Sequence, residues 1–216
     1  MYSTMTGNQP RGRQRPSSVS GEYRSQKILR VGAEGPKFDI FEHDAEHAYG
    51  VFQSVAIYMW RGAMQDYHPA QARDRWAQLR DTIGHFGVLV VILPSAPPPP
   101  LRLRNGVMHA YHSFARHIRG VGTVLEDQGV RGAASAMAMT AIMLMSKPPY
   151  GYRNDTNVAA TADWLAGRLQ PEGPSGEEIA GVVEHMRARY TVACESFYRE
   201  PLCNARNSWM ASLRPR

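Results

Sequence analysis

The sequence predicts an α/β protein in which helices pack on a mostly parallel sheet. Short runs rich in β-branched and aromatic residues alternate along the chain with segments whose apolar residues recur at helical spacing. The run VLVVIL at residues 88–93 is apolar at every position, which is typical of a strand covered on both faces. With 216 residues, of which 43% are hydrophobic, the chain can build one sizeable core.

The expected order of elements is β, β, α, β, α, β, α, β, α. Residues 37–42 alternate in polarity and predict a first strand, and the dense apolar run 49–60 predicts one second strand antiparallel to it. In the helix that follows, Trp76 and Leu79 mark the apolar face. The later expected elements are strands at 88–93, 120–125 and 150–153, with helices near 107–118, 130–145 and 156–169.

Three regions divide the chain in this interpretation. Residues 1–36 are rich in Ser, Gly, Pro, Gln and Arg, and we expect a disordered basic leader. Residues 37–170 form the α/β domain, and residues 171–216 add a C-terminal helix and a basic tail. The segment 132–145 is apolar nearly all round but too short to span a bilayer, so it predicts a buried helix. Its methionines are expected to fill the core, with a soft partner surface as the alternative: Met137, Met139, Met143 and Met145.

The C-terminal addition is predicted to be an amphipathic helix over about 177–199. Ser175 and Glu178 have the spacing of a capping box at its start. An apolar stripe follows, and it packs either on its own domain or on a partner: Ile179, Val182, Val183, Met186, Tyr190 and Phe197.

Four stretches carry a family resemblance: WRG at 60–62, the strand 88–93 with its proline-rich exit, the turn DQGVRG at 127–132 and ADWL at 162–165. With the order of elements over 49–169, they resemble the STAS domain, the fold of anti-sigma-factor antagonists, and especially the SpoIIAA-like proteins of bacteria such as myxobacteria. The resemblance implies a phosphorylatable hydroxyl beside the Gly that opens a helix, but Gln128 stands there and Ser135 is the substitute considered. The expected ligand or partner edge is Glu126, Asp127, Gln128, Arg131 and Ser135.

Histidine patterns offer two metal hypotheses. The stretch from His43 to His47 matches H-x-x-E-H, but zinc chemistry needs a helix there, and we expect a hairpin connection. His109, His112 and His117 lie among arginines, so we interpret that helix surface as basic and solvated. We therefore expect no metal, no cofactor and no catalytic residue.

The preferred functional hypothesis is a non-enzymatic regulatory or scaffolding module that acts through protein contacts or self-association. One alternative is non-specific binding of an anion or a nucleic-acid backbone by basic termini, and a second is a small enzyme with a site at residues 126–131. The basic residues of the termini are Arg11, Arg13, Arg15, Arg24, Lys27, Arg30, Arg206, Arg214 and Arg216. With two cysteines and no apolar leader or membrane span, the expected location is the cytoplasm.

Overall fold

A computed structural model describes residues 40–94, 96–126 and 129–191. The expected leader 1–36 therefore lies outside the described residues, as do Asp127, Gln128, Phe197 and the basic C-terminal tail. None of the helices within the described ranges is both long and apolar enough to cross a membrane.

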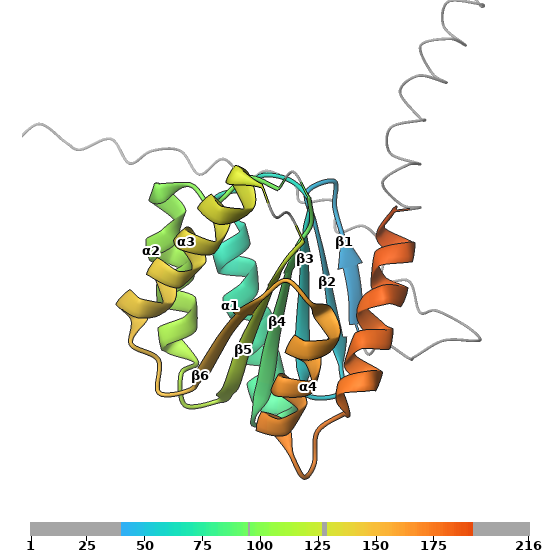
Figure 1. Cartoon of the computed structure of the whole chain (residues 1–216). Helices are drawn as coiled ribbons and strands as arrows, with labels where there is room; N and C mark the ends of the chain where they lie inside the picture. The colour runs from blue at the N-terminus through green and yellow to red at the C-terminus, as the bar shows by residue number, and fades with distance from the viewer. Residues whose placement is uncertain (1–39, 95, 127–128, 192–216) are drawn as a thin grey trace, which may run out of the picture.

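The fold is an α/β sandwich around one six-stranded sheet (Figure 1). The strands lie in chain order, β1 to β6; the pairs β1–β2 and β2–β3 are antiparallel and the other three pairs are parallel. The predicted fold class, a mostly parallel sheet with packed helices, is confirmed at this level. The elements are β1 (Ile40–His43), β2 (His47–Phe52), β3 (Val55–Trp60), α1 (His68–Ile83), β4 (Phe86–Ile92), α2 (Leu101–Ser113), β5 (Ile118–Leu125), α3 (Val130–Ser146), β6 (Gly151–Asp155) and α4 (Val158–Leu169).

The prediction of one strand over residues 49–60 is wrong, because the chain folds there into a tight hairpin. Phe52 pairs with Val55, so Gln53 and Ser54 alone form the turn between β2 and β3. Such a turn needs positive φ angles, and Gln53 has a φ of 48°. The residues that usually mark this turn are Gly and Asn, and their absence leaves the hairpin without a local sequence signal.

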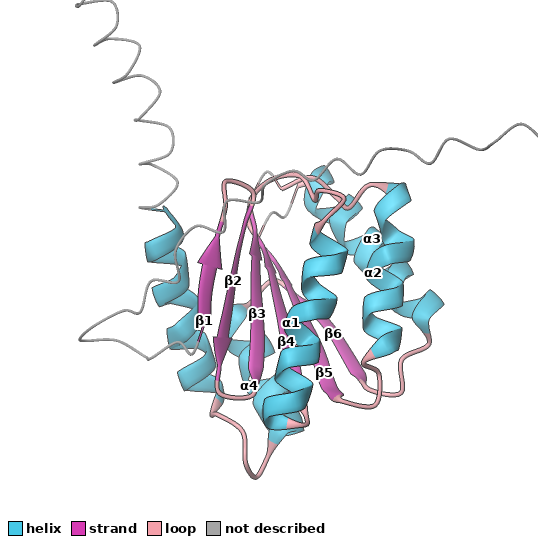
Figure 2. Ribbon diagram, turned by 180° about the vertical axis from the view of Figure 1, so that it is seen from behind, coloured by secondary structure: helices cyan, strands magenta, loops and turns pink. Residues whose placement is uncertain are grey.

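Two helical layers cover the sheet (Figures 1 and 2). The three crossover helices α1, α2 and α3 lie on one face, as expected when successive parallel strands are joined by right-handed crossovers. On the other face lie α4 and a helix formed by residues 176–191. Each layer encloses its own apolar cluster, so β3 and β4 are buried on both sides.

The helix α3 is not buried all round, which corrects the sequence-based expectation. Met139 and Met143 face the core, whereas Met137 and Met145 are exposed. The helix covers the outer edge of the sheet and packs against α2 on one side, so a large part of its surface has no neighbour among the described residues. A periodicity argument cannot detect this exposure, because the residues on the outer face of α3 are themselves apolar.

The helix 176–191 begins with reciprocal hydrogen bonds between Ser175 and Glu178. The Glu178 amide donates to Ser175 Oγ at 3.2 Å, and the Ser175 amide donates to Glu178 Oε2 at 2.8 Å. Five residues of the apolar stripe, Ile179, Val182, Val183, Met186 and Tyr190, are buried against the sheet of the same chain.

Candidate functional site

A cavity of about 70 Å³ lies between the sheet and the α1–α2 pair. It is at the carboxyl ends of β3 and β4, near Trp60 and Ile92, the last residues of these strands. Open parallel sheets bind ligands at this edge. Its walls are mainly apolar and aromatic, and include Tyr58, Trp60, Trp76, Val90, Ile92, Val107, Tyr111 and Met139.

The Tyr58 hydroxyl and the Trp76 indole nitrogen Nε1 in the cavity wall form no well-directed hydrogen bond with the described residues, although the two groups lie close enough to interact with each other. Residues Tyr58 and Trp76 are only 5% and 3% exposed. Leaving a buried polar group unpaired costs about 1–3 kcal/mol. Burial raises the pKa of Tyr58 well above its ordinary value, and hydrogen-bonding contacts with Trp76 and Arg75 offset this only in part. Tyr58 therefore keeps its proton at neutral pH and is available to donate it.

Arg75 brings a positive charge to the same wall, but this charge is already compensated. Its guanidinium lies 4.3 Å from the centre of the Tyr49 ring and forms an ion pair with Glu42 of β1. Its Nη1 atom lies 3.5 Å from His47 Nε2. The Arg75 side chain is only 12% exposed, so these three contacts replace most of its hydration.

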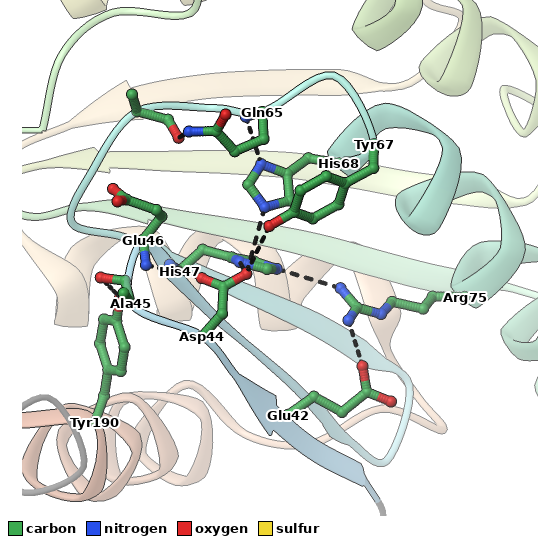
Figure 3. A network of polar contacts seen from close by, with 11 residues as sticks. Glu42, Asp44, Ala45, Glu46, His47, Gln65, Tyr67, His68, Arg75 and Tyr190 are labelled. Carbon is green, nitrogen blue, oxygen red and sulfur yellow. Dashed lines mark hydrogen bonds and ion pairs between the residues drawn. The ribbon is translucent and has the colours of Figure 1, made fainter. Parts of the chain in front are cut away.

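Asp44 organises the polar side of the site (Figure 3). Its Oδ1 atom accepts hydrogen bonds from the backbone amides of Glu46 and His47, both at 2.8 Å. Its Oδ2 atom lies 2.8 Å from His47 Nδ1, 3.2 Å from the Tyr67 hydroxyl and 3.5 Å from His68 Nε2. One carboxylate thus joins the β1–β2 loop to the first residue of α1.

Protonation states follow from these contacts. Burial opposes the charge of Asp44, but hydrogen bonds from His47 and His68 outweigh it, so the pKa of Asp44 lies well below its ordinary value. Burial lowers the pKa of His47, although Asp44 acts in the opposite direction. The site at neutral pH therefore holds an ionised Asp44 beside a neutral His47, whose Nδ1–H donates to the carboxylate and whose Nε2 faces Arg75.

Asp44, His47 and His68 have ligand atoms within 4.8 Å of one another, so a metal ion must be considered. His68 Nδ1 accepts a hydrogen bond from the Gln65 amide at 2.8 Å, which places the proton of the neutral ring on Nε2. That proton occupies the position through which His68 would ligate a metal. The cationic Arg75 beside His47 Nε2 adds repulsion. The geometry therefore fits a hydrogen-bond network better than a metal centre.

The residues of the predicted ligand edge that the structure describes lie in different surroundings. Glu126 is bound by Arg187 of the helix 176–191 within the same chain. Ser135 is 1% exposed on the inner side of α3, and its hydroxyl has no partner among the described groups. The side chain of Arg131 is outside the described part of the structure.

The histidine patterns also separate. The stretch from His43 to His47 connects β1 and β2 as a hairpin, as expected. His109 and His112 are exposed on α2, and His117 Nδ1 lies 2.9 Å from the Gly84 carbonyl oxygen.

Sequence reasoning missed the cavity, although it expected ligands at this edge of the sheet. It placed the ligands after the carboxyl end of β5, whereas the cavity lies at the carboxyl ends of β3 and β4. The sequence did contain a signal for the cavity, because Trp60 ends a strand and His68 and Pro69 begin the next helix. The contact between His47 and His68 could not be found, because it joins residues from separate elements.

The chain matches no family model, no curated protein and no solved structure. The resemblance to the STAS domain therefore rests on the sequence stretches alone.

Proposed function

We propose that this chain is a non-enzymatic module that binds a small, mainly apolar molecule carrying a hydrogen-bond acceptor. The observation that carries the proposal is a pair of buried donors, the Tyr58 hydroxyl and Trp76 Nε1, that form no well-directed hydrogen bond with the described residues and lie in the wall of an aromatic cavity. A buried donor without a partner calls for an explanation, and an acceptor atom on a ligand supplies one.

The size and charge of the cavity narrow the ligand. Its volume of about 70 Å³ is roughly half of the 150 Å³ that holds a benzene molecule in an engineered cavity. Only a small molecule, or one end of a longer one, fits inside. Because Glu42 already neutralises Arg75, the donors favour an uncharged acceptor such as a carbonyl oxygen over a free anion.

The composition of the wall favours binding over covalent catalysis. The described residues that line the cavity include no Ser, Thr, Cys, Lys, Asp or Glu, so the commonest side-chain nucleophiles are absent from that part of the wall. The His47 Nε2 atom, the one that would take a proton from a substrate, faces the Arg75 guanidinium. A positive neighbour disfavours a proton on that nitrogen.

The regulatory role expected from the STAS resemblance fits this proposal. The ligand would fill the space between the sheet and the α1–α2 pair, so its binding would restrict the motion of these helices against the sheet. A partner that contacts α1 or α2 would then distinguish the bound from the free chain. Ligand binding and protein contact are thereby parts of one regulatory function.

The test is a titration of the ¹⁵N-labelled full chain with ketones of increasing size, from acetone to cyclohexanone, followed by NMR. A carbonyl bound between the donors should move the indole N–H signal of Trp76 downfield, saturably. The Trp76→Phe variant assigns the signal. Trp164, which lies with α4 on the opposite face of the sheet, provides the internal control. Tyr58→Phe should weaken binding roughly fivefold through the loss of one hydrogen bond worth about 1 kcal/mol.

Equal shifts of Trp76 and Trp164, or binding that Tyr58→Phe leaves unchanged, would refute the proposal. Cyclopentane has the shape of cyclopentanone but no acceptor. If it bound as tightly as the ketone, the cavity would select apolar volume alone, and the donors would have no part in recognition.

A further inference from the structure

The outer face of α3 exposes large apolar side chains to an unusual degree. Val130, Met137, Leu144 and Met145 are 59 to 89% exposed. The first three are spaced seven residues apart, so they lie along one side of the helix. Leu101, at the start of the neighbouring α2, is 76% exposed. We call these five residues the α3 face. Exposed apolar residues grouped in this way mark interaction sites more often than scattered ones do.

The charged residues within α2 and α3 are all basic, whereas Glu126 and Asp127 stand in the sequence just before α3. The sequence has no Asp or Glu at residues 82–125 or 129–154, a span that includes all of α2 and α3. Arg102 on α2, Arg116 just after it and Lys147 at the end of α3 are exposed. Arg102 pairs with the exposed Asp66 of the preceding loop.

The opposite side of the sheet has the reverse balance. Residues 155–191, which include α4 and the helix 176–191, contain more acidic than basic residues. The acidic residues are Asp155, Asp163, Glu172, Glu177, Glu178 and Glu184, and the basic residues are Arg168, Arg187 and Arg189. The molecule therefore presents a basic, apolar layer on one side and an acidic layer on the other.

We propose that the α3 face docks on the surface of an anionic lipid bilayer. Aliphatic side chains that protrude between basic residues match the boundary between acyl chains and negatively charged headgroups. In this arrangement α3 lies along the membrane plane, Met137 and Leu144 enter the boundary, and Arg116 and Lys147 meet the headgroups. The acidic layer on the other side of the sheet points away from the membrane.

The same observations disfavour other occupants. A nucleic-acid backbone would use the arginines but would leave the aliphatic residues in water. A second copy docked by the same face would bring two basic surfaces together. A protein partner is the remaining occupant, because methionine-rich surfaces also bind proteins, and the vesicle test below separates it from a bilayer.

The test is flotation of the full chain with phosphatidylcholine vesicles, with and without about 30% phosphatidylserine. We expect binding to the anionic vesicles alone, and weaker binding as salt rises from about 0.05 to 0.5 M. The double variant Met137→Glu with Leu144→Glu should bind the anionic vesicles at least about tenfold more weakly than the parent chain, since both apolar insertion and charge attraction are reduced. Both side chains are exposed, so its thermal midpoint should match that of the parent chain.

Ala159→Glu, an exposed position on α4, is the control and should bind as the parent does. Binding that survives the double substitution would belong to the basic termini and would overturn the proposal. Failure to bind anionic vesicles would overturn it equally. A dimer that the double variant converts to a monomer, without vesicle binding, would assign the face to contacts between copies instead.

Discussion

Arg187 binds Glu126 with both ends of its guanidinium group. Nη1 lies 2.8 Å from Glu126 Oε2, and Nη2 lies 2.5 Å from Oε1, although 61 residues separate the two in sequence. The pair ties the helix 176–191 to the carboxyl end of β5. Tyr190 adds a second tie, because its hydroxyl donates to the Ala45 carbonyl oxygen at 3.2 Å. One helix thus holds both the end of a central strand and the loop that carries Asp44.

We predict that Arg187→Ala lowers the free energy of unfolding by about 1 kcal/mol, because it leaves a partly buried carboxylate without its partner. The side chains are 31% and 15% exposed, so solvent screens part of the interaction. Arg187→Lys keeps the charge but loses the two-point geometry, so its free energy of unfolding should lie between those of Arg187→Ala and the parent. Urea unfolding measures the difference. Asp81→Ala, which breaks an exposed pair with Arg80 on α1, should change nothing measurable, and an equal loss there would contradict the argument.

Val183→Glu should destabilise the chain by several kcal/mol without changing its mass. Val183 is fully buried between the helix 176–191 and the sheet, so the substitution places a charge in an apolar cluster. Thermal unfolding gives the stability, and sedimentation gives the mass. The control is Ala188→Glu on the exposed side of the same helix, which should behave as the parent. A folded variant of half the parent mass would show that the helix also mediates a dimer.

Adding zinc should not stabilise the protein. His68 Nε2 carries a proton that Gln65 fixes there, and Arg75 occupies the space before His47 Nε2. The thermal midpoint with excess Zn²⁺ should equal that in a chelator, and His43→Ala with His47→Ala should leave the metal content of the purified chain unchanged. Stoichiometric zinc that the double variant loses would show that the network rearranges around an ion.

The sequence predicted the class of the fold well because its signals are local. An apolar run such as residues 88–93 indicates a doubly covered strand whatever its neighbours are. The β2–β3 hairpin was missed because Gln53 adopts a positive φ without being Gly or Asn. The exposure of α3 was missed for a different reason: coverage depends on where an element lies in the sheet, and α3 lies over its edge.

The candidate site was beyond local reasoning. Asp44, His68 and Arg75 belong to a loop and to two turns of a helix, and only the tertiary fold brings them together. The H-x-x-E-H pattern drew attention to His47 but suggested zinc, whereas the decisive partners of this residue are Asp44 and Arg75. Hydrogen-bond direction, which separates the two interpretations, is a property of coordinates and not of spacing.

His47 should make the stability of the protein depend on pH. Burial lowers its pKa in the folded state, so below about pH 6.5 the unfolded chain takes up the proton more readily than the folded chain. The stabilisation that the folded chain gains by keeping His47 neutral is complete above pH 6.5 and is lost as the pH falls toward the folded-state pKa. Asp44 stays ionised in this window because its pKa lies well below its ordinary value.

Urea unfolding of the parent and of His47→Gln, from about pH 7.5 to pH 5, measures this dependence. The parent should lose stability more steeply than the variant as the pH falls. His109→Gln, at an exposed position on α2, serves as the control and should follow the parent curve. Parallel curves for the parent and His47→Gln would contradict the assignment.

Helix α4 approaches β5 closely at Gly122. A Cβ atom placed there would lie 2.5 Å from Thr161 Cγ2 and 3.3 Å from Leu89 Cδ1. The first distance is too short for two carbon atoms, so the helix or the side chain would have to move. Thr161 is fully buried, and its hydroxyl donates to the Asn157 carbonyl oxygen at 2.9 Å, which holds it in place.

Gly122→Ala should therefore destabilise the protein by about 1–3 kcal/mol through overpacking. Thr161→Ser removes the methyl group that clashes but keeps the hydroxyl that bonds Asn157, so the double variant should recover most of the loss. The free energies of unfolding of the two single variants and the double variant give the coupling. Gly167→Ala, on the open side of α4 with nothing within 4 Å, should be neutral or mildly stabilising. Additive effects of Gly122→Ala and Thr161→Ser would mean that the helix shifts as a body, and that this methyl group does not set the distance between α4 and the sheet.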